Sequence, residues 1–223
     1  MNLARKEMHS FRLLSDNKKP KVLCLGAHSD DIEIGCGGTV IKIIKDAPEA
    51  EFCWVVFSGD EKRAKEARLS ANIFLEGTAS KSITVGNHRE SYFPFIGADI
   101  KDSFEKLAQQ FSPDIIFTHY KNDAHQDHRL ISDLTWNTFR NHFILEYEIP
   151  KYDGDLGNPN TYVCLDEITV QNKVKWICEF FQSQSKKQWF TEDIFKSILR
   201  IRGAESNSPS KFAEAFYCRK IIF

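Results

Sequence analysis

The sequence predicts a single α/β domain of Rossmann-like type, in which helices cover both faces of a mainly parallel sheet. One observation behind this prediction is that short apolar runs alternate with stretches of helical periodicity along most of the 223-residue chain, the pattern of repeated βαβ units. The other is that two of these runs lead directly into segments rich in histidine and aspartate. Open α/β sheets place their ligand sites at such strand ends.

Strands and helices are expected to alternate three times in the first half of the chain. Apolar runs such as Val22 to Leu25 are typical of buried strands. The expected strands are 21–26, 51–58 and 82–85. The expected helices are 40–47, 60–77 and 99–111, the second with Asp60 as its N-cap and Gly77 at its end. An irregular loop is expected at 86–98.

The second half continues this alternation. The expected strands are 114–118, 143–149, 161–165 and 212–223. The expected helices are 127–142 and two with apolar stripes, Val174 to Phe181 and Ile194 to Ile201. The loop at 150–160 is rich in Pro, Gly, Asp and Asn, and it either flanks a substrate pocket or is a plain surface connection.

Length and composition fit one cytoplasmic domain, expected at 20–223 after a polar N-terminal arm at 1–19. The formal net charge of −1 offers no electrostatic case for binding nucleic acid or an anionic membrane. No run approaches the roughly 18 apolar residues of a membrane span, and the N-terminus lacks the apolar core of a signal peptide. The six cysteines form no Cys-x-x-Cys pair, which indicates reduced, buried thiols.

The segment from Gly26 to Thr39 contains the first group of candidate site residues. His28, Asp30 and Asp31 directly follow the first apolar run. Adjacent carboxylates repel each other unless a cation or several hydrogen-bond donors compensate them. On this segment alone, a histidine that caps a turn and an Asp31 that caps a helix explain the pattern equally well.

A second segment of the same kind runs from Thr118 to Arg129. It follows the apolar run at 115–117 and contains His125, Asp127 and His128. Imidazole and carboxylate groups suit Zn²⁺ and its divalent neighbours, so two strand ends that each deliver both predict a metal site. His119 receives no role, because a lone histidine is usually a surface residue or a satisfied core residue.

The two segments resemble the motifs of the PIG-L/LmbE-like metal-dependent N-deacetylases, Ala-His-Pro-Asp-Asp and His-Pro-Asp-His. The resemblance extends from about Lys21 to the end of the chain, including Ala-Glu-Ala-Phe at 213–216. This chain departs from the family pattern at Ser29, Ile32 and Gln126. None of these three positions would supply a ligand, a base or an acid.

The resemblance implies a metal ion held by His28, Asp31 and His128. Zn²⁺ is the expected ion, with another divalent transition metal such as Fe²⁺ as the alternative. Three protein ligands leave one coordination position for water, as catalytic zinc sites require.

The resemblance also implies catalytic roles. Asp30 would be the general base, and His125 would protonate the leaving amine with Asp127 holding it charged. Two alternatives stay open, namely that Asp30 only orients a ligand histidine and that Asp127 only caps a helix. Arg63 matches a position that contacts substrate, although pairing with Glu66 on a helix surface explains it equally well.

The expected function is hydrolysis of the N-acetyl group of an acetylated amino sugar or sugar conjugate by a zinc-dependent enzyme. The expected partner is that small molecule, and a homo-oligomer stays open. One rival is a metal-dependent phosphoesterase, which would need more ligands than the two motifs supply. The other is a metal- or sugar-binding protein without catalysis, against which the intact Asp30 and His125 argue.

Overall fold

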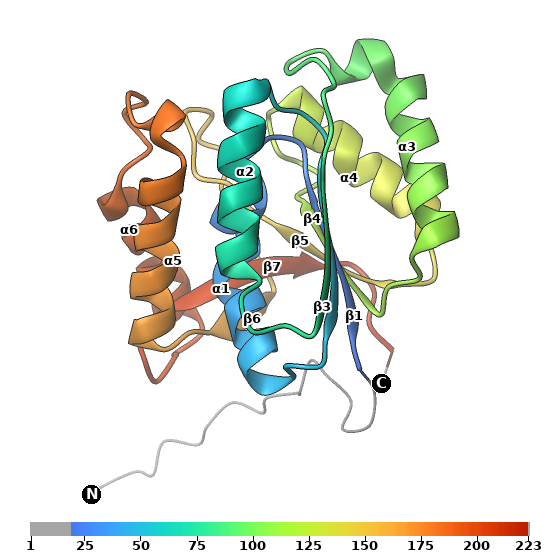
Figure 1. Ribbon diagram of the computed structural model, residues 1–223. Coiled ribbons are helices and arrows are strands. Elements are labelled where there is room, and N and C mark those ends of the chain that lie inside the picture. The colour runs from blue at the N-terminus through green and yellow to red at the C-terminus, as the bar shows by residue number, and fades with distance from the viewer. Residues whose placement is uncertain (1–18, 223) are drawn as a thin grey trace, which may run out of the picture.

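The computed structural model describes residues 19–222, which form one seven-stranded sheet with helices on both faces (Figure 1). The strands are β1 (Lys21–Gly26), β2 (Glu51–Val56), β3 (Ser80–Val85), β4 (Ile115–His119), β5 (Phe143–Tyr147), β6 (Thr161–Cys164) and β7 (Ala213–Cys218). The α-helices are α1 (Asp31–Asp46), α2 (Glu61–Phe74), α3 (Gly97–Gln110), α4 (Gln126–Thr138), α5 (Glu167–Phe180) and α6 (Glu192–Glu205). Short 3-10 helices are η1 (Phe93–Ile96) and η2 (Gln182–Gln184). The predicted arm at 1–19 lies outside the described residues except for Lys19.

The strand order is β3-β2-β1-β4-β5-β7-β6. The five strands from β3 to β5 pair in parallel, so the predicted Rossmann-like, mainly parallel sheet is confirmed. β7 is antiparallel to both of its neighbours, β5 and β6. The sequence pattern does not predict this insertion, because the pairing joins segments that are far apart in the chain.

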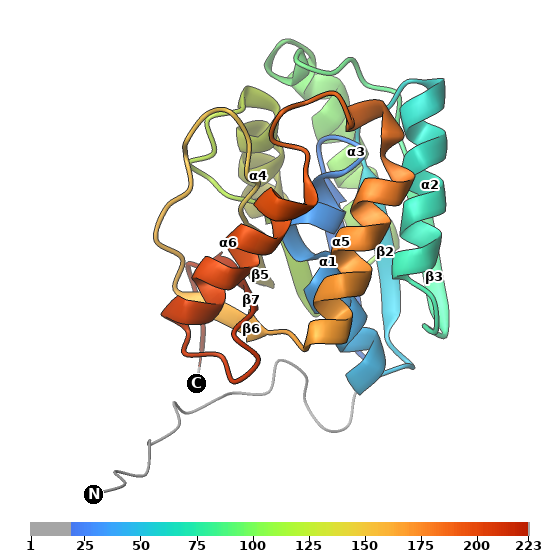
Figure 2. The ribbon, with the colours of Figure 1, turned by 90° about the vertical axis from the view of Figure 1, so that its left-hand side faces the viewer.

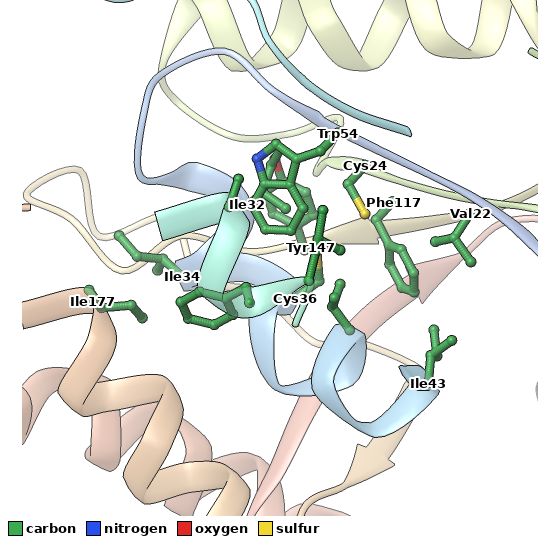
Figure 3. Close-up of a cluster of buried hydrophobic side chains, with 14 of the residues drawn as sticks. Val22, Cys24, Ile32, Ile34, Cys36, Ile43, Trp54, Phe117, Tyr147 and Ile177 are labelled. Atoms are coloured by element: carbon green, nitrogen blue, oxygen red, sulfur yellow. The ribbon is translucent and has the colours of Figure 1, made fainter. Parts of the chain in front are cut away.

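The sheet separates two hydrophobic cores. Successive side chains of a strand point to opposite faces, and β1 follows this rule. Val22 and Cys24 enter a core covered by α1, α2, α5 and α6, part of which Figure 3 shows. Leu23 and Leu25 enter a second core covered by α3 and α4. Figure 2 shows α1, α5 and α6 together on the first face.

α1 begins at Asp31, whereas the sequence pattern predicts a helix only from residue 40. Gly35 and Gly37 lie inside this helix rather than in a turn. A Cβ atom at Gly35 would lie 2.1 Å from the ring of Tyr147, and one at Gly37 would lie 2.5 Å from the ring of Phe74. The glycines therefore allow close packing of the helix, which carries Asp31 to the end of β1.

Other element boundaries differ from the predictions by a few residues. α4 ends at Thr138 instead of 142, and the last strand ends at Cys218 instead of 223. η1 and the start of α3 lie within the loop predicted at 86–98. The predicted N-cap is confirmed, because the side chain of Asp60 accepts the backbone N–H of Arg63 at 2.8 Å.

Two predictions from composition can be compared with the structure. All six cysteines are free, and Cys24, Cys36 and Cys53 are buried. Cys178 and Cys218 are half-buried and Cys164, on the edge strand β6, is exposed, so the prediction of buried thiols is wrong for these three residues. Within residues 19–222, no helix has both the length and the apolar character needed to cross a bilayer.

Candidate metal and catalytic site

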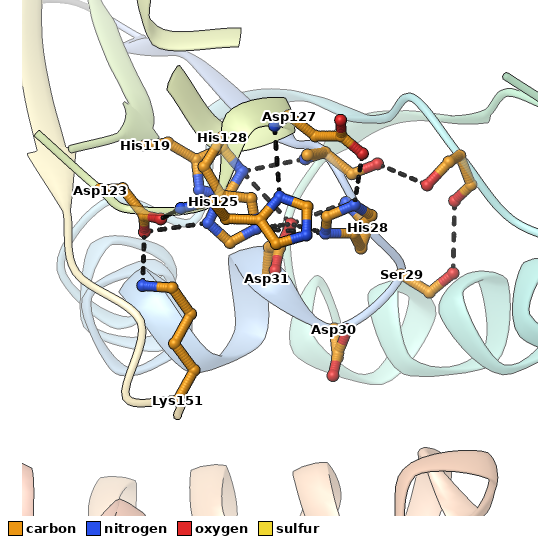
Figure 4. Close-up of polar contacts among 12 residues, drawn as sticks. His28, Ser29, Asp30, Asp31, His119, Asp123, His125, Asp127, His128 and Lys151 are labelled. Atoms are coloured by element: carbon orange, nitrogen blue, oxygen red, sulfur yellow. Dashed lines mark hydrogen bonds and ion pairs between the residues drawn. The ribbon is translucent and has the colours of Figure 1, made fainter. Parts of the chain in front are cut away.

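The two segments rich in histidine and aspartate meet at the carboxyl ends of β1 and β4, which are neighbours in the sheet (Figure 4). His28 lies in the turn after β1, and Asp31 is the first residue of α1. His128 lies in the first turn of α4. Since α1 and α4 pack on opposite faces of the sheet, this edge is the switch point where open α/β sheets bind ligands.

The structure brings together the three residues predicted as metal ligands. His28 Nδ1 lies 3.1 Å from His128 Nε2. Asp31 Oδ2 lies 3.4 Å from His28 Nδ1 and 3.5 Å from His128 Nε2. All three side chains are buried, so three potential ligand atoms face one another in a small space that is shielded from solvent.

The other ring nitrogen of each of these two histidines lies within hydrogen-bond distance of a carboxylate. His28 Nε2 lies 3.1 Å from Asp127 Oδ2, and His128 Nδ1 lies 2.9 Å from Asp123 Oδ2. A ring nitrogen that faces a carboxylate carries the proton of a neutral imidazole. When both rings are neutral, His28 Nδ1 and His128 Nε2 therefore carry the lone pairs, and these two nitrogens lie 3.1 Å apart. Two lone pairs at this distance repel each other unless a proton or a metal ion lies between them.

The spacing of the three atoms fits a divalent metal ion. Ligand atoms at about 2.0–2.1 Å from a tetrahedral zinc ion lie about 3.3–3.4 Å from one another, close to the three observed separations. Among residues 19–222, the groups of three or more possible ligands are His28 with His125 and His128, and Asp31 with His119 and His128. Both groups contain His128, so the candidate ligands at this edge form one cluster.

The pKa shifts of these groups are consistent with one positive charge in the cluster. Burial lowers the pKa of His28, but the charge of Asp31 and a hydrogen bond to Asp127 outweigh burial and raise the pKa to about 10. Burial raises the pKa of Asp31, yet the surrounding histidines hold it well below its usual range. Burial and the neighbouring His119 lower the pKa of His128 to about 3. The cluster therefore accommodates one cation and keeps the second imidazole neutral.

The carboxylate of Asp127 forms a hydrogen bond with His28 and none with the ring of His125. Its Oδ2 also accepts the backbone N–H of Ser91 at 2.6 Å, and its Oδ1 accepts that of Phe93 at 3.2 Å. This corrects the prediction that Asp127 orients His125, because side chains two positions apart at the start of a helix point in different directions. Nor is Asp127 the N-cap of α4, since His125 occupies that position.

His125 lies next to the ring of His28, with 4.8 Å between the ring centroids. Its Nδ1 accepts the backbone N–H of Asp127 at 3.2 Å. In the neutral form of His125, the ring proton is therefore on Nε2. Burial and the charge of His28 lower the pKa of His125, contrary to the expectation that a carboxylate partner raises it.

Asp30 forms an ion pair with Arg63, whose Nη2 lies 3.0 Å from Asp30 Oδ1. Figure 4 shows Asp30 pointing away from the imidazoles, and within the described part of the chain no hydrogen bond joins it to a histidine. Arg63 also contacts Glu90, whereas Glu66 accepts hydrogen bonds from Ser183. Burial raises the pKa of Asp30, although the charge of Arg63 opposes this shift.

Two further residues belong to the site although the sequence reasoning gave them no role. His119 is fully buried, and its ring stacks on that of His128 with 3.9 Å between the centroids. Its Nε2 lies 3.2 Å from Asp31 Oδ2. Its place at the end of an apolar run was a usable signal, because the site lies at that strand end. Asp123, the partner of His128, offered no signal beyond its nearness to the second motif.

A comparison with models of protein families matches residues 23–139 to the PIG-L family, described as GlcNAc-PI de-N-acetylase. The match covers more than half of the chain and includes His28, Asp31 and His128. The chain belongs to the PIG-L family. It is therefore an enzyme of the N-deacetylase type.

Solved structures share the fold of this PIG-L protein. N,N'-diacetylchitobiose deacetylase from Pyrococcus horikoshii, in complex with an inhibitor, is 22% identical, with a TM-score of 0.62 over 89% of this chain and 83% of that one. The zinc-inhibited form of teicoplanin deacetylase Orf2 is 12% identical, with a TM-score of 0.64 over 89% and 97%. The hydratase GalB from Pseudomonas putida, which acts on 4-carboxy-2-hydroxymuconate, is 14% identical, with a TM-score of 0.69 over 92% and 98%. At these identities the likeness shows the fold alone.

Proposed function

We propose that this PIG-L protein is a zinc-dependent hydrolase that removes an N-acetyl group from an acetylated amino sugar or sugar conjugate. The observation that carries the proposal is that His28 Nδ1, His128 Nε2 and Asp31 Oδ2 lie within 3.1–3.5 Å of one another. These three residues would hold the ion. Two imidazoles and one carboxylate suit Zn²⁺, and the same donors also suit Fe²⁺.

The residues around this centre can carry out the proton transfers of amide hydrolysis. A divalent ion supplies Lewis acidity, which polarises a carbonyl group and makes water more acidic. Asp30 takes a proton from the attacking water, and its raised pKa makes it a stronger base than an exposed aspartate. In its imidazolium form, His125 delivers the Nε2 proton to the leaving nitrogen and returns to the neutral ring, so that the amine departs as a neutral group.

The two remaining predicted residues, Asp127 and Arg63, position His28 and Asp30. Asp127 supports catalysis through His28, because its contact with Nε2 fixes the ring so that Nδ1 faces Asp31 and His128, where it would help to hold the ion. Arg63 orients Asp30 through the ion pair at 3.0 Å. Its second ion pair, with Glu90 of the 86–98 loop, places the guanidinium between the base and that loop. We retain Arg63 as a substrate contact in this proposal.

The substrate class is supported by the family and by one structural neighbour. The family description names a de-N-acetylase of a GlcNAc conjugate, and the neighbour from Pyrococcus horikoshii is a deacetylase of an acetylated chitobiose. Both descriptions concern an acetamido group on a sugar. The hydratase with the same fold shows that the fold does not decide the reaction, so the reaction must be assayed directly.

The test is a screen of N-acetylated sugars and sugar conjugates with the zinc-loaded protein, in which free acetate and new primary amine are both measured. We expect the two products in equal amounts from at least one compound, together with one divalent ion per chain. Two ions per chain with release of phosphate from phosphate esters would favour the phosphoesterase. A chain that carries one ion and releases no acetate from the panel would contradict the proposed reaction.

A further inference from the structure

We propose that Lys151 is a positioning residue that couples the β5–β6 loop (148–160) to the metal centre through Asp123. The inference rests on the proposed function only in that His128 is taken as a metal ligand. The sequence leaves open whether this loop flanks the site or merely connects two strands. The contacts of Lys151 indicate that the loop flanks the site.

Asp123 forms hydrogen bonds with two residues of the second histidine-rich segment, His128 and His125. Its Oδ2 lies 2.9 Å from His128 Nδ1, and its Oδ1 accepts the backbone N–H of His125 at 2.7 Å. The same carboxylate therefore orients the ring of one proposed ligand and the backbone of the proposed acid. Its own orientation decides where His128 Nε2 points, since a ring held at one nitrogen is directed at the other.

Lys151 reaches this carboxylate from the β5–β6 loop. Its Nζ lies 3.0 Å from Asp123 Oδ2, the oxygen that also faces His128, and Figure 4 shows the side chain rising toward Asp123. The Lys151 side chain is only 8% exposed. An ammonium group with so little access to water needs carboxylate partners. Lys151 has a second one in Asp155.

Asp155 provides a second contact between the β5–β6 loop and the segment that contains Asp123. Its Oδ2 accepts the backbone N–H of Ala124 at 2.6 Å and also pairs with Lys151. The two loop residues thus contact two successive residues of the segment that leads into α4. A displacement of the loop would remove both contacts at once.

The loop is also held independently of Lys151, which makes its role testable. Arg202 of α6 pairs with Glu148 through two hydrogen bonds of 2.7 Å. Arg202 Nη2 also donates to the carbonyl of Gly157 at 3.0 Å. Both ends of the loop therefore stay attached when Lys151 is replaced. What is lost is the connection between the middle of the loop and Asp123.

The coupling has two consequences. Without Lys151, Asp123 keeps its contacts with His125 and His128 but loses the cation that fixes its Oδ2. Residues that orient a metal ligand typically change metal affinity by about 10–100-fold. Linkage is reciprocal, so an ion that fixes His128 and Asp123 must also stabilise the loop contacts. Metal binding should therefore slow hydrogen exchange of the backbone amides at 149–156.

The experiment compares wild type with Lys151→Met, Lys151→Arg and the control Lys196→Met. Lys196 forms an exposed ion pair with Glu192 on α6, far in sequence from both motifs. Zinc affinity of the metal-free full-length chains is measured by competition with a chelator, and hydrogen exchange at 149–156 is measured with and without zinc. We expect Lys151→Met to bind zinc about 10–100-fold more weakly and to lose the zinc-dependent protection. Lys151→Arg should recover part of both, and the control should match wild type.

The outcomes separate this inference from the proposed function. If Lys151→Met binds zinc as tightly as wild type and keeps the protection at 149–156, the coupling is refuted while the metal site stands. If wild type binds zinc but deacetylates nothing, the reaction is refuted and the coupling is judged by the affinities alone. A wild type that binds no zinc overturns both. If Lys151→Met does not fold, Asp155→Asn replaces it, with weaker zinc binding and reduced protection expected and wild-type values again refuting the coupling.

Discussion

At the scale of single residues, each proposed histidine ligand depends on a carboxylate that does not face the ion. Asp127 determines which nitrogen of His28 carries the proton, and Asp123 does the same for His128. Asp30 has a different environment, because its partner is Arg63. Substitution of Asp30 is therefore expected to lower activity, whereas substitution of Asp127 is expected to weaken metal binding.

Asp30→Asn should abolish most of the activity and leave the metal in place. The substitution removes the group that takes a proton from water while keeping the size of the side chain, and we expect kcat to fall by about 10²–10⁴-fold. Metal content by elemental analysis and kcat on the best substrate are measured together. A variant that is purified without metal would show that Asp30 is a ligand.

Asp127→Asn should weaken metal binding, because the amide nitrogen can face His28 Nε2 and reverse which ring nitrogen carries the proton. We expect zinc affinity to fall by about 10–100-fold. Chelator competition at pH 7 measures this, with Asp133→Asn on the exposed side of α4 as the control. Unchanged zinc affinity with a large fall in kcat would support the contact with His125 that the sequence suggests.

At the scale of elements, α1 is held in place by a buried ion pair from the C-terminal half of the chain. Glu214 of β7 accepts the backbone N–H groups of Gly38 and Thr39 at 2.7 and 2.6 Å. Lys173 of α5 pairs with Glu214 at 2.6 Å and donates to the carbonyl of Ile34 at 2.7 Å. Two elements far along the chain thus fix the helix whose first residue is a proposed ligand.

Glu214→Gln should strongly destabilise the fold, because it leaves the ammonium of Lys173 buried without a counter-charge. We expect the free energy of unfolding to fall by about 3–5 kcal/mol. Glu105→Gln, which removes one partner of the exposed pair with Lys101 on α3, should change it by less than about 1 kcal/mol. Urea unfolding of the metal-free chains measures both. Adding Lys173→Met to Glu214→Gln should restore part of the loss, and a purely additive effect would argue against the coupling.

The N-cap of α5 provides a prediction of pH dependence away from the metal centre. The side chain of Asp166 accepts the backbone N–H of Thr169 at 2.7 Å. This hydrogen bond, aided by Lys45, lowers the pKa of Asp166 from 3.8 to about 2. Because the folded pKa lies below the unfolded one, the ionised cap stabilises the fold above pH 3.8, and this contribution is lost as the pH falls from 3.8 toward 2.

Asp166→Ala should therefore lower the free energy of unfolding by about 1 kcal/mol at pH 7, and the difference from wild type should shrink below pH 4. The exposed pair between Asp166 and Lys45 adds little to this value. Denaturant unfolding at pH 7, 5 and 3 measures the difference, with Lys45→Met to separate the ion pair from the cap. A difference that grows on acidification would mean that the cap does not act through its ionised form.

At the scale of the whole molecule, the proposed metal site joins two βα units whose histidine ligands are 100 positions apart in the chain. An ion that binds the folded state alone stabilises it by about 2.7 kcal/mol at a free concentration of 100 Kd. For a chain of this size we expect Tm to rise by about 5–10 °C. Calorimetry with and without zinc measures the rise. His128→Ala should remove it, and an equal rise in that variant would place the zinc elsewhere.

The sequence by itself determined the alternation of strands and helices, the parallel character of most of the sheet, and the two segments that meet at the candidate metal site. These features are local, because apolar periodicity and the residues that end each strand are properties of short stretches of chain. The three proposed ligands follow from the same logic. Strands whose carboxyl ends share one edge must bring the residues after them together.

Only the tertiary structure decided the partners of those residues. Asp127 lies two residues from His125 but contacts His28, 99 positions away. Lys151 contacts Asp123 from a loop whose role the sequence left open, and β7 inserts antiparallel between β5 and β6. Such contacts depend on the distances between elements after packing, and no local pattern encodes those distances. The hydrogen bonds that orient each ligand are therefore read from the fold and not from the motif.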